Sequence, residues 1–260
     1  MLIADLLPSP RLALRVATFL LMGLPAVAFA DGVAGGGDLE DAAARSWRSH
    51  ATENFELSAV GTAAEVREMS SALETQLTEL RKDWSITAAS GGWSPRCKVV
   101  VHAARPAYLA AAGPGAERTN GSSLVHFDRG RVVGRRIDLD GQRLDWQAET
   151  VPHELTHVLL ADEFPHGRLP RWADEGAAML ADSKQKRARH RRDALLAGEQ
   201  GRAFSVAQLL AVDRPLPASR MAAFYGQSLI LVEDLVARGD RRRFLDFLHA
   251  ADHHGYDSSL

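Results

Sequence analysis

The sequence predicts an α+β fold with a strand-rich first half and a helical second half. Apolar segments of the strand type fall between residues 51 and 144, where they are short and either alternating or continuous. From residue 145 onward the apolar residues recur every three or four positions, as they do in amphipathic helices. Strands followed by a run of helices, without regular alternation of the two, indicate an α+β arrangement.

The composition excludes several classes of protein. The chain has 260 residues, of which 46% are hydrophobic and 25% are charged, and these values are typical of a globular protein. The formal net charge of −2 argues against a nucleic-acid-binding protein, which would carry a basic excess. A single cysteine excludes an intramolecular disulfide framework. Nothing in the sequence indicates an oligomeric state.

Residues 1–30 predict a secretory signal peptide that is not part of the fold. Arg11 and Arg15 precede an uncharged apolar run, which ends in the A-x-A cleavage pattern at residues 28–30. The alternative is a membrane anchor, but the run is about 15 residues long and a helix needs roughly 20 to span a bilayer. We therefore expect an exported bacterial protein of the periplasm or extracellular space, with no stable membrane insertion after cleavage.

The expected mature chain contains one domain. Residues 31–50 predict a flexible lead-in, because they begin with the glycine-rich segment DGVAGGGD. Residues 51–260 are expected to form a single domain, strand-rich over 51–144 and helical over 145–260.

The strand-rich half contains four predicted strands and one helix. Alternation of apolar and polar residues predicts a strand over 54–60, and apolar residues at steps of three and four predict a helix over 63–84. A short apolar run predicts a strand over 97–102. Residues 123–127 and 132–139 flank the turn segment DRGR and predict a hairpin. We expect its second strand to be an edge that could receive a peptide as an added strand.

The helical half is divided by capping residues and glycines. Ser205 and Asp240 are candidate N-caps, and Gly239 ends the helix before it. The predicted helices contain or span residues 153–161, 171–182, 184–197, 205–212, 222–237 and 240–250.

The strongest local signal is the segment HELTH at residues 153–157. On a helix, residues at i and i+4 project from one face, so His153 and His157 can bind the same zinc ion. Glu154 lies beside them, where a carboxylate can take a proton from a metal-bound water. The neighbouring residues are mostly apolar, which predicts a buried helix. Buried histidine and glutamate need partners, and a metal ion supplies them.

A hydrolytic zinc site needs a third protein ligand, and Glu175 is the candidate. It follows His157 by eighteen residues, in the segment LPRWADEGAA. A second helix that returns antiparallel to the first, after a turn at 165–168, could aim Glu175 at the two imidazoles. Two histidines, one glutamate and an open position for water form the coordination set of a hydrolytic zinc site.

HELTH followed by WADEGAA resembles the gluzincin metallopeptidases, whose third zinc ligand is a glutamate on a following helix. More closely, the chain is similar to a bacterial family of peptidase-MA-like secreted or envelope proteins, common in planctomycetes. The similarity covers most of residues 50–257, in the segments NFEL, WSPRCKVVVH, GRRIDL, VPHELTHVLL, LPRWADEGAAML and FYGQSLILVEDL.

The resemblance implies a zincin-like (gluzincin) fold with the active site between the two halves of the domain. It implies one zinc ion per chain, with His153, His157 and Glu175 as ligands and Glu154 as the general base. Tyr225 stands where gluzincins carry a tyrosine that stabilises the oxyanion, and a half-buried core tyrosine is the alternative. The expected function is that of an exported zinc metallopeptidase acting on peptides or proteins. The chain lacks a G-x-M-E-N motif, which the related aminopeptidases use to hold a free N-terminus, so we expect an endopeptidase.

Two other functions share these residues. One is a non-catalytic zinc-binding envelope protein that uses the zincin fold as an interaction scaffold. The other is hydrolysis of a non-peptide amide of the cell wall. Only the two enzymatic functions require Glu154, because this residue is not needed as a zinc ligand. Glu154 therefore distinguishes the enzymes from the non-catalytic scaffold.

Four further features have two interpretations each. Cys97 follows Pro95-Arg96, as in the latency segment of some secreted zinc proteases, but a buried structural thiol is favoured. Asp174 could support a zinc ligand or face solvent. Trp172 is expected in the core and not in contact with substrate. The basic segment 184–192 could bind polyanions, although a solvated helix face is favoured.

Overall fold

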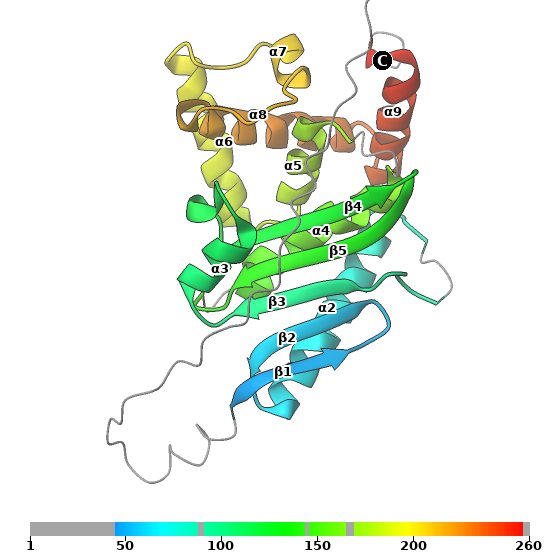
Figure 1. Cartoon of the computed structure of the whole chain (residues 1–260). Coiled ribbons are helices and arrows are strands. Elements are labelled where there is room, and N and C mark those ends of the chain that lie inside the picture. Colours follow the sequence, from blue (N-terminus) through cyan, green and yellow to red (C-terminus); the bar gives the residue numbers. More distant parts are fainter. Residues whose placement is uncertain (1–44, 88–90, 144–145, 165–168, 257–260) are drawn as a thin grey trace, which may run out of the picture.

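The computed structural model describes residues 45–87, 91–143, 146–164 and 169–256. The predicted signal peptide, residues 31–44 of the predicted lead-in and the predicted turn at 165–168 lie outside the described residues. The described part has an α+β fold built on one five-stranded mixed sheet, and this confirms the predicted fold class (Figure 1). No helix among the described residues is both long and apolar enough to cross a membrane.

The strands are arranged in the order β1-β2-β3-β5-β4. β1 (Ser46–Ala51) pairs antiparallel with β2 (Phe55–Gly61), which pairs parallel with β3 (Cys97–His102). β3 pairs parallel with β5 (Arg131–Asp140), and β5 pairs antiparallel with β4 (Gly121–Asp128). The edges of this sheet are therefore β1 and β4.

Two sequence-based expectations about the sheet are wrong. The predicted lead-in over 31–50 includes residues 46–50, which belong to β1; this strand is almost wholly exposed, so no apolar alternation marks it, and backbone pairing with β2 holds it. The predicted edge at 132–139 lies in β5, which is paired on both sides. The free edge of the hairpin is its first strand, β4.

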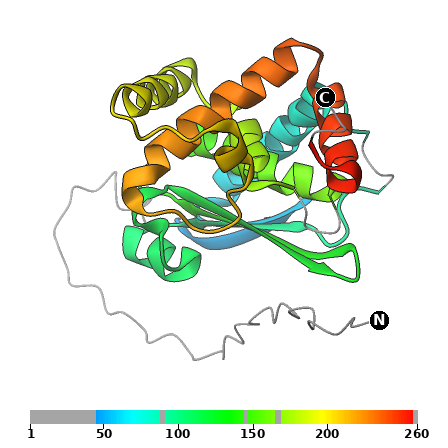
Figure 2. The same ribbon diagram turned by 90° about the horizontal axis from the view of Figure 1, so that it is seen from above.

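Two helices cover one face of the sheet (Figures 1 and 2). α2 (Ala63–Asp83) connects the parallel strands β2 and β3, and it begins with a capping box in which Thr62 and Glu65 exchange hydrogen bonds. α4 (Val151–Glu163) carries the HELTH segment and follows a π-helical turn at Trp146–Thr150. Pro152 lies in the first turn of α4, where its missing N–H costs no hydrogen bond.

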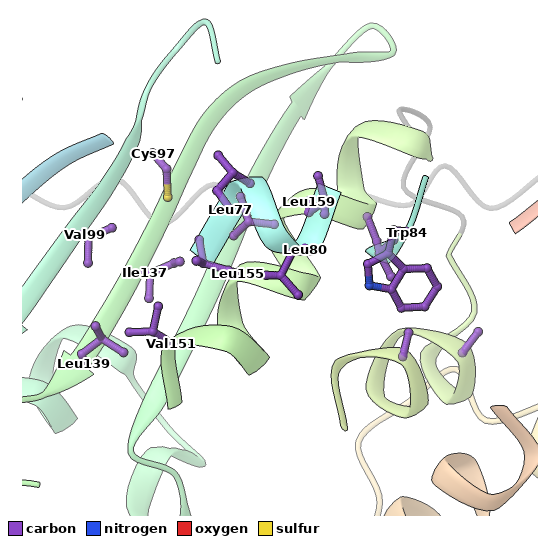
Figure 3. Close-up of a cluster of buried hydrophobic side chains, with 14 of the residues drawn as sticks. Leu77, Leu80, Trp84, Cys97, Val99, Ile137, Leu139, Val151, Leu155 and Leu159 are labelled. Atoms are coloured by element: carbon purple, nitrogen blue, oxygen red, sulfur yellow. The ribbon is translucent and has the colours of Figure 1, made fainter. Parts of the chain in front are cut away.

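The main core lies between the sheet and these two helices (Figure 3). Side chains from the two central strands meet apolar side chains from one face of each helix, and each buried leucine contributes roughly 1.5–3 kcal/mol to stability. The labelled members are Leu77, Leu80, Trp84, Cys97, Val99, Ile137, Leu139, Val151, Leu155 and Leu159.

Helix α3 (Arg105–Ala112) and the 3-10 turn η1 (Ala116–Arg118) precede β4 and are absent from the sequence prediction. The helix has eight residues, too few to show an apolar period. Its main role is local, since the Tyr108 hydroxyl donates a hydrogen bond to the Gly121 carbonyl at 2.8 Å, at the start of β4.

The remaining helices lie beyond the β4 edge of the sheet (Figure 1). Ser183, Ser205 and Asp240 cap three of them through their side chains, so both predicted caps are confirmed. The long helix begins four residues before the predicted residue 222. The helices are α5 (Arg171–Met179), α6 (Lys184–Glu199), α7 (Val206–Leu210), α8 (Ala218–Ala237) and α9 (Arg241–His254).

Cys97 is a structural thiol. Its side chain faces the core from the start of β3 and is 0% exposed, and burial raises the pKa of the thiol to about 12. A protonated thiol inside a packed core cannot act as a thiolate ligand to a metal. The favoured interpretation of this residue as a buried thiol is therefore confirmed.

This burial predicts that Cys97 is protected from thiol reagents in the folded chain. At pH 8 we expect the folded chain to react with 5,5′-dithiobis(2-nitrobenzoate) at least about tenfold more slowly than the unfolded chain, because only locally opened molecules expose the thiol. Chains unfolded in guanidinium chloride should release one equivalent of thionitrobenzoate. Rapid reaction of the native chain would contradict the core position.

Candidate metal centre

A pocket of about 590 Å³ lies between the β4 edge of the sheet and the helical half of the domain. Alternate residues of β4 form one wall, because successive side chains of a strand point to opposite faces. α4 forms the floor, and α5, α6 and α8 supply the opposite wall. The β4 residues in this wall are Gly121, Ser123, Val125 and Phe127.

Helix α4 has two faces with different functions. One face is fully buried in the core and consists of Val151, Leu155, Val158, Leu159 and Leu160. The other face lines the pocket with His153, Glu154, His157 and Ala161, and the flanking residues Thr150 and Phe164 also line it. The 3.6-residue period of the helix therefore forces both histidines and Glu154 into the pocket once the apolar face is packed.

Helix α5 brings the predicted third ligand to the same point. One ligand atom each from His153, His157 and Glu175 lies within 4.8 Å of the other two, and no other such group occurs among the described residues. His157 Nε2 lies 4.0 Å from Glu175 Oε2. The three residues that the sequence predicts as ligands therefore form a cluster that could hold a metal ion.

Each histidine of the cluster is held by an aspartate through its other ring nitrogen. His157 Nδ1 lies 2.7 Å from Asp174 Oδ1, and His153 Nδ1 lies 3.2 Å from Asp182 Oδ1. A carboxylate at Nδ1 fixes the ring orientation and leaves Nε2 free to bind a metal ion. Asp174 is therefore in contact with His157, as the interpretation of a supporting residue requires, although its side chain is 34% exposed.

Asp182 is a site residue that the sequence analysis missed. It follows Glu175 by seven residues, which is two helical turns, so an acidic residue on the same side of the helix was the available signal. Its side chain is 0% exposed and also accepts a hydrogen bond from Lys186 Nζ at 2.7 Å. Burial opposes its charge, but His153 and Lys186 outweigh burial and lower the pKa of the carboxyl group.

The charged groups of the cluster shift one another's pKa values. Burial raises the pKa of Glu175, and the nearby imidazoles only partly oppose this. For His157, burial disfavours the charged ring, yet Asp174, Glu175 and Glu154 raise its pKa to about 10. Three carboxylates thus draw positive charge to this point, and a metal ion supplies the same charge.

Glu154 lies at the tight junction of α4 and β4. Its side chain is 8% exposed and borders the pocket. A Cβ atom on Gly121 would lie 2.8 Å from Glu154 Oε1 and 2.5 Å from Thr150 Cγ2, so only glycine allows the strand to approach the helix this closely. The close approach places the Glu154 carboxylate beside the edge strand and next to the metal cluster.

Tyr225 enters the pocket from α8. A Cβ atom on the next residue, Gly226, would lie 2.3 Å from the His190 carbonyl oxygen, so this glycine allows α8 to pack closely against α6. Burial, followed by the charge of Glu175, raises the pKa of Tyr225 to about 12, so the phenol is a neutral hydrogen-bond donor. The helix predicted over 222–237 would place Tyr225 in its first turn, but α8 begins at Ala218, so Tyr225 lies at the end of the second turn.

The structure also decides the remaining sequence-based interpretations. Trp172 is 0% exposed and belongs to the core, as expected. The basic segment at 184–192 is only partly a solvated face, because Lys186, Arg189 and His190 line the pocket.

Comparisons with known proteins add no assignment. Neither the protein-family models nor the curated proteins contain a match to this chain. The similarity to gluzincins therefore stays a prediction from the HELTH and WADEGAA segments.

The cluster predicts one tightly bound metal ion per chain. We expect elemental analysis of the purified chain, after dialysis against a weak chelator, to find about one equivalent of metal. His157→Ala should lose it, because two protein ligands bind much more weakly than three. His126→Ala is the matched control, since this histidine is exposed on the face of β4 away from the pocket. Absence of metal from the unmodified chain would exclude the site.

The two aspartates predict a graded loss of metal affinity. Asp182→Asn and Asp174→Asn keep the side-chain volume but remove the charge that orients each imidazole. We expect each change to raise the Kd for the metal about 10- to 100-fold, measured by competition with a chromogenic chelator. Asp193→Asn, on α6 and outside the pocket lining, should leave the Kd unchanged. Unaltered affinity in both site variants would show that the aspartates do not support the ligands.

Proposed function

We propose that the chain is an exported zinc metallopeptidase of the gluzincin type. The observation that carries the proposal is the convergence of His153, His157 and Glu175 in a pocket that Glu154 also borders. A site that only stores a structural ion is normally closed by four protein ligands, whereas three ligands and an open pocket suit catalysis.

The donor set fits zinc. Two donors each about 2.0–2.2 Å from one zinc ion lie at most about 4.4 Å apart, and the 4.0 Å between His157 Nε2 and Glu175 Oε2 is within this reach. Imidazole nitrogens suit zinc, and the mixed nitrogen and oxygen set disfavours calcium and magnesium, which prefer oxygen alone. A zinc ion bound here would act as a Lewis acid and lower the pKa of water toward about 7.

The chain's own residues supply the remaining steps. Glu154 takes a proton from the attacking water on a carboxylate oxygen and later delivers it to the leaving amine. Tyr225 donates its phenolic proton in a hydrogen bond to the carbonyl oxygen, where negative charge develops. Asp174 and Asp182 keep the two imidazoles in position throughout.

The edge strand β4 offers the seat for a peptide. Its outer backbone groups have no strand partner among the described residues, and its alternate side chains line the pocket. An extended peptide could pair with this edge and lie across the metal cluster. This seat replaces the strand at 132–139 that the sequence suggested. A groove open along an edge strand suits an endopeptidase, which binds chain on both sides of the cleaved bond.

The decisive variant is Glu154→Gln. We expect it to retain zinc and to lose at least about a thousandfold in kcat on an internally quenched peptide library, because the general base is removed while the ligands stay. Glu149→Gln is the control, in the π-helical turn before α4 and outside the pocket lining. Equal activity of Glu154→Gln and the unmodified chain, with zinc bound in both, would favour the non-catalytic scaffold.

Tyr225→Phe tests the oxyanion donor. Loss of one such donor typically lowers kcat about 100- to 1,000-fold, and we expect KM to change less than threefold because the bond forms mainly in the transition state. Zinc content should be unaffected, since the phenol is not among the ligands. A fall in stability with unchanged kcat would assign Tyr225 to packing alone.

A further inference from the structure

The pocket is an elongated groove that runs along β4 and α4, from the start of both elements toward their ends. Gly121, at the start of β4, abuts Thr150 and Glu154 at the start of α4. Near the other end of α4, Asp162 forms an ion pair with Arg135, whose partner across the hairpin is Val125. At about 3.3 Å per residue, the strand spans about 20 Å from residue 121 to residue 127. At about 1.5 Å per residue, the helical segment from residue 150 to residue 164 spans about the same length. The groove can therefore hold about six residues of extended peptide.

One end of this groove is cationic. His190 Nε2 lies 3.9 Å from Asp182, which holds both His153 and Lys186, so these α6 residues border the first turn of α4. Arg118 precedes Gly121 by three residues and so reaches the same end from the β4 side. The cationic end is formed by Arg118, Lys186 and Arg189, and the His190 ring borders it.

Part of the positive charge at the cationic end is not neutralised by any described acidic residue. Asp182 compensates Lys186, but Arg118 and Arg189 are exposed and form no ion pair with any described residue. The Nδ1 atom of His190 is buried without a hydrogen-bond partner in the described structure. Burial is the main reason that the pKa of His190 is lowered, so the ring is a neutral polar group at pH 7.

The loop that carries Arg118 is held by hydrogen bonds from Arg105, which is partly buried. The guanidinium of Arg105 donates to the carbonyl oxygens of Ala116, Glu117 and Thr119 at 3.2, 2.9 and 2.6 Å. It also pairs with Asp140 at 3.0 Å, which ties the loop to the sheet. The backbone beside Arg118 is therefore preorganised, which reduces the entropy lost when a ligand binds.

The other end of the groove is apolar. It lies past His157 toward the end of α4, where Phe164 stacks on His249 at a centroid distance of 4.3 Å. The apolar end is formed by Val125, Phe127, Ala161, Phe164 and Leu169. The candidate ligands His153, His157 and Glu175 lie between the two ends.

We infer that the pocket selects peptides that carry a carboxylate on one side of the cleaved bond and an apolar side chain on the other. The inference rests on the proposed peptidase function and names its substrate class. The carboxylate can be an acidic side chain or the C-terminus of the peptide, since both present the same group to Arg118 and Arg189.

The test is equilibrium binding, which does not require cleavage. Three fluorescein-labelled hexapeptides each contain one phenylalanine, and they differ in one variable residue and in the state of the C-terminus. They carry Glu with an amidated C-terminus, Gln with an amidated C-terminus, or Gln with a free C-terminus. Each is made with Phe before and after the variable residue. Binding is measured by fluorescence anisotropy, on zinc-loaded Glu154→Gln protein and on the metal-free unmodified chain.

We expect a carboxylate-bearing peptide to bind about tenfold more tightly than its neutral counterpart at low ionic strength, and less so in salt. Preference for the Glu peptide would assign the group to a side chain, and preference for the free acid would assign it to the C-terminus. The preference is the ratio of the Kd of the neutral peptide to that of the carboxylate-bearing peptide. Arg118→Gln and Arg189→Gln should each lower this ratio about two- to fivefold. Both residues are exposed, so the variants should fold.

Arg192→Gln is the matched control, because this arginine is exposed on the same helix and lies outside the pocket lining. Equal affinities for all three peptides would overturn the inference, as would a loss in Arg192→Gln equal to that in Arg189→Gln. Since binding is measured without turnover, such a result would leave the peptidase proposal intact. Charge-dependent binding by a chain that cleaves no peptide would instead support the groove and contradict the peptidase.

Discussion

The site depends on one packing constraint, which is the burial of a single face of α4 against the sheet. Val151, Leu155 and Leu159 meet the central strands and α2 in the core (Figure 3). Rotation of this helix about its axis would expose these side chains, each at a cost of roughly 1.5–3 kcal/mol. The same packing keeps His153 and His157 on the opposite face and in the pocket. The core therefore fixes the positions of the two candidate ligands.

The helices after α4 supply the remaining residues of the candidate metal site. α5 contributes Glu175 and Asp174, and the residue Asp182 beyond its end reaches back to His153. Asp182 is buried and Asp174 and Glu175 are partly buried, and all three lie beside the imidazoles. Partly buried carboxylates favour positive charge nearby, and a metal ion is one group that could supply it.

Among the described residues, the sheet ends in two edge strands that lie in different environments. β1 is short and almost fully exposed, whereas β4 forms a wall of the pocket. An unpaired edge is a hazard for aggregation, and proteins usually cover it or interrupt it. Here a bulge interrupts the ladder at His126 and Phe127, and the helical half rises beyond the edge. The remaining open stretch faces the metal cluster, where pairing with an extended chain would be useful.

The sequence by itself determined the α+β class, most helices and the candidate ligand set, because these depend on spacing along one chain segment. HELTH places two imidazoles on one helical turn, and Glu175 needs only a returning helix. The edge position of β4, the aspartate at 182 and the cationic end of the groove were decided by tertiary structure. Which strand is an edge depends on partners far away in the chain, and Arg118 and Arg189 border the same pocket only because η1 and α6 both lie beside it. Local periodicity carries no information on such contacts, so only the folded chain reveals them.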